Sequence, residues 1–159
     1  MRNRLLQSGD ESLKPRFRRI FSTVTDMIDD DILPARMSEY TYQIASRTDF
    51  EAIRRIRESN AKMLIEELQS LPITFLQAKA GFSDVYVPIL VENRDEIQRN
   101  LSAMGIFCTV IWPLSDRQNA CCRVAKQTEE QMLAVYCDQR YSADDMKYVA
   151  SGIKRVYNE

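Results

Sequence analysis

The chain has 159 residues, of which 22 are basic, 23 are acidic and none is histidine. A formal net charge of −1 favours neither nucleic acid nor a membrane surface as a partner, and the missing histidine removes the commonest general base in enzymes. No segment approaches the roughly 20 apolar residues of a membrane span, so we expect a cytoplasmic protein. The length suits one domain, which we place at residues 16–159 after an N-terminal tail at 1–15.

The first half of the chain has helical periodicity. Apolar residues recur at spacings of three and four between Lys14 and Ile32, which predicts a helix that ends before Pro34. A short segment with Tyr40, Tyr42 and Ile44 follows. Asp49 is a suitable N-cap for a second helix, which we expect to end at Leu71 before Pro72.

The second half alternates between strand and helix patterns. The β-branched segment 84–91 predicts a strand, and its Pro88 indicates a sheet edge or a bulge. Residues 93–96 have the form of a capping box, and the helix that follows should end at Gly105. The apolar run 106–111 predicts the next strand.

The remaining elements complete an α+β architecture. We expect a short helix at 120–126, a third strand at 131–137, and a last helix that Ser142 and Asp145 cap. Long N-terminal helices therefore lead into a small mixed or antiparallel sheet of about three strands, packed with helices.

Cysteine and glycine usage excludes several kinds of site. The four cysteines, which are Cys108, Cys121, Cys122 and Cys137, have no CxxC spacing, so we interpret them as ordinary thiols and predict no metal site. Four glycines cannot form a P-loop or a GxGxxG fingerprint.

Three polar features are candidates for a functional role as well as a structural one. Asn60 interrupts the apolar stripe of the second helix, one turn after Arg57, and we interpret it as a structural tie, with a ligand role as the alternative. Asp138 and Arg140 precede the last helix, where turn chemistry and a local ion pair explain most of the pattern. The loop after Trp112 offers polar groups, although a lone tryptophan often only covers a core.

Several segments resemble the C-terminal part of the DegT/DnrJ/StrS family of pyridoxal-phosphate sugar aminotransferases. The matching pieces are "RESNAKMLIEEL", "YVPILVENRDEIQRNLSAMGIFCTVIWPL" and "VYCDQRYSADDM". They are similar to the family's R-x-x-N helix, its P-x-x-V-x-N-R-D step, its G-I strand with an aromatic-Pro-Leu end, and its D-Q-R-Y turn. The four motifs occur in the family's order.

The resemblance implies the small domain of the aspartate-aminotransferase fold type I. Family members are dimers that use pyridoxal phosphate to move an amino group from an amino acid to a keto-sugar nucleotide. In them the aromatic-Pro-Leu loop shapes the substrate pocket. By resemblance, the substrate-binding residues here are Trp112, Pro113, Leu114, Ser115, Arg117 and Asn119. Ser115 stands where members often have histidine, and Arg117 or Asn119 could replace its contact.

No catalytic residue can be assigned, because the family's cofactor-binding lysine lies in a large domain upstream of these motifs. The lysines here are Lys14, Lys62, Lys79, Lys126, Lys147 and Lys154, and none has that sequence context. We therefore expect a truncated or split enzyme domain that is inactive alone, forms homo-oligomers, needs a separately encoded large domain and binds no cofactor by itself. The alternative is a non-catalytic interaction or regulatory module that dimerises through the same domain.

Overall fold

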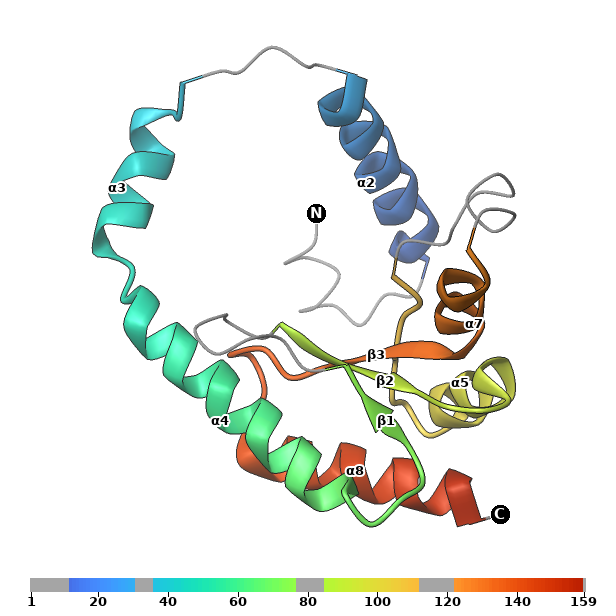
Figure 1. Cartoon of the computed structure of the whole chain (residues 1–159). Coiled ribbons are helices and arrows are strands. Elements are labelled where there is room, and N and C mark those ends of the chain that lie inside the picture. The colour runs from blue at the N-terminus through green and yellow to red at the C-terminus, as the bar shows by residue number, and fades with distance from the viewer. Residues whose placement is uncertain (1–11, 31–35, 77–84, 112–121, 159) are drawn as a thin grey trace. The chain divides into compact units, whose positions relative to one another are not determined.

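The computed structural model describes residues 12–30, 36–76, 85–111 and 122–158 (Figure 1). The chain divides into two compact units, Met1–Thr48 and Asp49–Glu159. Within the described ranges, no helix is both long enough and apolar enough to cross a membrane. The fold is α+β, as predicted.

Two helices make up the described part of the first unit. Helix α2 spans Leu13–Asp30, in agreement with the predicted helix. Helix α3 spans Glu39–Arg47, where the sequence suggested only a short connecting segment. Ser38 caps α3, because its hydroxyl accepts a hydrogen bond from the Thr41 backbone N–H at 3.2 Å. This local cap, with Glu39 in the first turn, explains the helix that apolar spacing alone did not predict.

Helix α4, Phe50–Leu68, opens the second unit. Its predicted cap is confirmed, since the Asp49 carboxylate accepts from the Ala52 N–H at 2.8 Å. The helix ends three residues before the expected Leu71. Helix α8, Ala143–Asn158, packs along α4 (Figure 1). It begins with the expected capping box, in which Asp145 accepts from the Ser142 N–H at 2.7 Å and donates its own N–H to the Ser142 hydroxyl at 3.3 Å.

The sheet is antiparallel, with the order β1-β2-β3. Its strands are β1 Thr74–Phe75, β2 Tyr86–Leu90 and β3 Met132–Tyr136. The register pairs Tyr86 with Tyr136 and Leu90 with Met132. The number of strands agrees with the prediction, but their identity differs. Segment 106–111 contributes one bridge, between Thr109 and Ala134, instead of a strand, and β1 takes the third place.

Pro88 lies in the central strand of this sheet, so its assignment to an edge or a bulge was wrong. Ala134, its partner in β3, directs its N–H and its carbonyl to Thr109 instead. The side of Pro88 that would carry a backbone N–H therefore faces β1, and not β3. There the Pro88 carbonyl accepts from the Leu76 N–H at 2.9 Å, but the proline cannot donate the return bond. The β1–β2 ladder accordingly has only two residue pairs.

Helices α5 and α7 flank the residues around the predicted substrate loop. Helix α5 spans Arg94–Ala103, and α7 spans Arg123–Gln131, later in the chain than the short helix expected at 120–126. The capping box proposed for 93–96 is not formed: Asn93 adopts a left-handed conformation, with φ of 55°, and its side chain makes no capping bond. Gly105 does end α5, with φ of 78°.

The core of the second unit lies between the sheet and helices α4, α5 and α8. Its largest fully buried side chains come from all four of these layers: Leu64, Leu68, Ile89, Leu101, Leu133, Met146 and Ile153. Burying each aliphatic side chain of this size contributes about 1.5–3 kcal/mol before the entropy cost of ordering it. The packed sheet and helices give the polar turn between β3 and α8 a rigid support.

Candidate functional site

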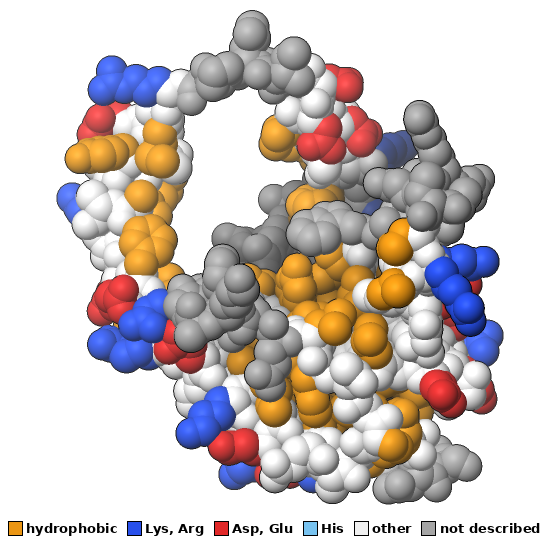
Figure 2. All heavy atoms as spheres, viewed as in Figure 1, with side chains coloured by type: hydrophobic (Ala, Val, Ile, Leu, Met, Phe, Trp, Pro, Cys, Tyr) orange, Lys and Arg blue, Asp and Glu red, His pale blue; other side chains and the backbone are white. Residues whose placement is uncertain are grey.

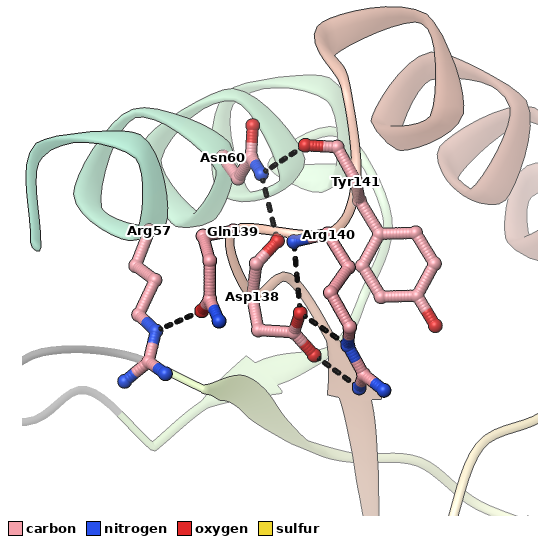
Figure 3. Close-up of polar contacts among 6 residues, drawn as sticks. All are labelled: Arg57, Asn60, Asp138, Gln139, Arg140 and Tyr141. Carbon is pink, nitrogen blue, oxygen red and sulfur yellow. Dashed lines mark hydrogen bonds and ion pairs between the residues drawn. The ribbon is translucent and has the colours of Figure 1, made fainter. Parts of the chain in front are cut away.

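The turn between β3 and α8 carries a network of hydrogen bonds and an ion pair (Figure 3). Asp138 is only 2% exposed, and its carboxylate accepts from the Arg140 backbone N–H at 3.0 Å. The Arg140 side chain closes a bidentate pair on the same carboxylate, with Nε–Oδ1 at 2.7 Å and Nη2–Oδ2 at 2.6 Å. These bonds satisfy a buried charge that would otherwise be costly.

The pair shifts both protonation equilibria toward the charged forms. Hydrogen bonds from the Arg140 side chain are the main cause that lowers the pKa of Asp138, and the same bonds raise the pKa of Arg140. The guanidinium also lies 5.8 Å from the centroid of the Tyr141 ring, within cation–π range. Asp138 therefore stays ionised at neutral pH and acts as a fixed structural acceptor, without the raised pKa that a general acid needs.

Helix α4 holds this turn from the other side (Figure 3). The Asn60 amide donates to the backbone carbonyls of Asp138, at 3.2 Å, and of Tyr141, at 2.9 Å. One turn earlier, Arg57 Nε donates to Gln139 Oε1 at 2.7 Å. The residues that the sequence pointed to, at 57, 60, 138 and 140, thus lie together although about 80 positions separate the two pairs. Gln139, which completes the contact, was not predicted.

The predicted substrate residues lie outside the described residues. These are Trp112, Pro113, Leu114, Ser115, Arg117 and Asn119. The segment that leads to them begins with a Schellman motif, in which the Ile106 N–H bonds to the Leu101 carbonyl at 2.9 Å and the Gly105 N–H bonds to the Ser102 carbonyl at 3.0 Å.

Helix α5 makes hydrogen bonds to the segments that precede and follow that loop in the sequence. Gln98 donates to the Cys108 carbonyl at 2.9 Å, four residues before Trp112. Arg94 is largely buried and donates to the carbonyls of Glu129, at 3.2 Å, and Met132, at 3.4 Å, at the end of α7. The sequence pointed to neither contact. In the sequence, these contacts are indicated only by the position of Arg94 and Gln98 on the same helix as the buried Ile97 and Leu101.

A pocket of about 240 Å³ lies beside the same segment. Its walls include Cys108, Tyr136, Tyr141 and Tyr148, and the one carboxylate among its described lining residues, Asp145, is engaged in the α8 capping box. Burial raises the pKa of the Cys108 thiol to about 11, so the thiolate needed of a nucleophile is scarce at neutral pH. The described residues that line this pocket include no lysine or arginine to hold a phosphate.

The four described lysines of the second unit all lie near carboxylates. Four lysine side chains lie at the surface, each within 4 Å of a carboxylate: Lys62 with Glu66, Lys126 with Glu130, Lys147 with Asp144, and Lys154 with Glu67. A lysine that binds the cofactor covalently needs a desolvated position beside the cofactor instead. Among the described residues, no cluster of three or more potential ligands is placed to hold a metal ion.

Comparison with solved structures shows that the fold is of the aminotransferase type. A DegT DnrJ EryC1 StrS aminotransferase from Brucella abortus matches with a TM-score of 0.59 at 18% identity, over 69% of this chain and 32% of that one. Helicobacter pylori PseC, an aminotransferase involved in the biosynthesis of pseudoaminic acid, matches with a TM-score of 0.60 at 15% identity, over 68% and 33%.

A third matching structure is a dehydratase and not an aminotransferase. GDP-4-keto-6-deoxymannose-3-dehydratase, solved with a trapped PLP-glutamate geminal diamine, matches with a TM-score of 0.54 at 17% identity, over 62% of this chain and 30% of that one. The chain therefore spans about a third of the length of these structures. No family model and no curated protein matches the sequence. The predicted resemblance to DegT/DnrJ/StrS aminotransferases is confirmed at the level of the fold.

Proposed function

We propose that this chain forms the small domain of a pyridoxal-phosphate-dependent sugar-nucleotide aminotransferase. The observation that carries the proposal is the structural match to sugar aminotransferases over about a third of their length, together with four sequence motifs in the family's order. The lysine that binds the cofactor belongs to a large domain, either on the same longer polypeptide or on a separate one. When bound there, pyridoxal phosphate supplies the electron sink for amino transfer.

The role of this domain is to position and enclose the substrate. The loop from Trp112 to Asn119 forms one wall of the substrate pocket, in which Trp112 offers an apolar face and Arg117 and Asn119 offer polar contacts. Helix α5 supports this role through the bonds of Gln98 and Arg94 to segments on both sides of the loop. Rigid support of this kind is what a binding loop needs in order to hold its residues in a productive geometry.

A cofactor-binding experiment tests the proposal. The purified chain is incubated with pyridoxal phosphate, reduced with borohydride and analysed by mass spectrometry, alone and together with a lysine-bearing large domain of a sugar aminotransferase. We expect no stoichiometric adduct on this chain, and glutamate-dependent conversion of the cofactor only when both polypeptides are present. Stoichiometric labelling of one of its own lysines, with amino transfer by the chain alone, would contradict the proposal.

One observation favours a second candidate, a non-catalytic module that dimerises. Apolar side chains of α2 and α3 are extensively exposed, including Phe21 at 64% and Tyr40 at 75%. A module of this kind would self-associate without affecting cofactor chemistry. Restored amino transfer on adding the chain to a large domain separates the two candidates, because only the enzyme domain completes an active site.

A further inference from the structure

Helix α2 presents an amphipathic surface in the first unit. Its apolar residues lie three and four positions apart on one face: Leu13, Phe17, Ile20, Phe21, Val24, Met27 and Ile28. No residue of the helix is buried, and the exposed fractions of the last five of these side chains run from 44% to 67%. This is the a, d and e spacing by which one helix packs along another.

The charges of α2 are ordered against its own dipole. Basic residues occupy the first two turns, and acidic residues the last two: Lys14, Arg16, Arg18 and Arg19, then Asp26, Asp29 and Asp30. Figure 2 shows acidic side chains gathered around the C-terminal end of this helix. Cations at a helix N-terminus and anions at its C-terminus are both unfavourable for the isolated helix. An antiparallel neighbour with the same sequence would place opposite charges side by side.

The register of such a pair follows from the sequence. Arg16, Thr23 and Asp30 recur at seven-residue intervals along one edge of the apolar stripe. If Thr23 lies at the two-fold axis, Arg16 of each copy faces Asp30 of the other, which gives two symmetric ion pairs. In the same alignment the apolar stripes of the two copies lie against each other, with Phe17 of one copy near the Met27–Ile28 end of the other. The two helices would then overlap from Arg16 to Asp30, over about 22 Å.

We infer that α2 is a self-association surface, at which it pairs antiparallel with α2 of a second copy of this chain. Charge complementarity identifies the partner. A helix that pairs with both ends of α2 must be acidic opposite Arg16 and basic opposite Asp30. The antiparallel α2 of a second copy has this charge pattern. A two-fold contact of this kind is closed, so association stops at the dimer. The inference is independent of the aminotransferase proposal, since it involves neither the second unit nor a cofactor.

Reciprocal charge reversals test the pairing in the full chain. Arg16→Asp makes both ends of the stripe acidic, and Asp30→Arg makes both ends basic. Each substitution places a charge that suits the helix dipole, so neither should unfold α2. We expect the unmodified chain to show a monomer–dimer equilibrium in sedimentation, and each variant alone to dimerise about tenfold more weakly or worse. A 1:1 mixture of the two variants should recover dimerisation, because both ion pairs form in the heterodimer.

The control is Arg55→Asp, which reverses an exposed charge on α4 and should leave the dimerisation constant unchanged. Far-UV circular dichroism supplies a second readout, because most of the stability of an amphipathic helix comes from the packing of its apolar face, so α2 should gain helicity when it pairs. A chain that stays monomeric up to its solubility limit would overturn the inference, as would a large-domain complex that forms while the chain alone remains monomeric. Equal dimerisation by the unmodified chain and both single variants would also overturn it.

Discussion

Asn60 is the residue that joins α4 to the turn before α8. Its amide donates two hydrogen bonds to backbone carbonyls inside the second unit. Asn60→Ala leaves both carbonyls without that donor in a buried place, so we expect a loss of about 1–3 kcal/mol in the free energy of unfolding. Chemical denaturation measures it. The matched control is Asn100→Ala, which removes an exposed amide from α5 and should change stability by less than about 0.5 kcal/mol.

Asp138 makes stability depend on pH in the acid range. Its pKa in the folded protein is lowered, mainly by hydrogen bonds from the Arg140 side chain. Its stabilisation is therefore fully present above the unfolded-state pKa of about 3.9, and is lost as the pH falls through the lower folded value. Asp138→Asn should reduce stability at neutral pH and flatten the decline below about pH 4.

Urea titrations from neutral to acid pH check this expectation. Asp144→Asn is the control, because its carboxylate is 93% exposed and lies 3.7 Å from Lys147. An Asp138→Asn variant that keeps the full acid-dependent loss of stability would show that other carboxylates produce it.

At the scale of elements, the end of α5 depends on the backbone of Gly105. Its φ of 78° is left-handed, and an added Cβ would meet nothing within 4 Å, so a substitution there costs backbone strain without a clash. We expect Gly105→Ala to destabilise the unit by about 1–2 kcal/mol. Gly105→Asn should cost less, because asparagine tolerates this conformation. Thermal denaturation of both variants distinguishes backbone strain from a steric clash, because a clash would destabilise the variant with the larger asparagine more.

At the scale of the whole molecule, Trp112 should matter more to turnover than to folding. In the proposed enzyme it forms part of the substrate pocket wall, so Trp112→Ala should lower the rate of the completed enzyme while changing the stability of this chain by less than about 0.5 kcal/mol. Phe107→Ala is the matched control, since that ring is 74% exposed in the preceding segment. Equal loss of rate in both variants, or unfolding of Trp112→Ala, would show that the tryptophan covers the core instead.

Local signals predicted most of the second unit's elements. The Asp49 cap, the Ser142–Asp145 box and the Gly105 terminator each involve residues within a few positions of one another, so the sequence specifies them directly. The capping box at 93–96 was the exception. Asn93 adopts a left-handed conformation there, which moves its side chain out of capping geometry.

The sequence by itself determined the α+β class, the helix α2, the caps that begin α4 and α8, the end of α5 at Gly105, and the importance of Asp138 and Arg140 in the turn before α8. Only the tertiary structure decided that Asn60 holds that turn, that Pro88 occupies the central strand, and that Thr74–Phe75 completes the sheet. The physical reason is distance along the chain. Caps and apolar periodicity act within one or two turns, whereas the bond from Asn60 crosses 78 positions and exists only after the sheet and helices have packed.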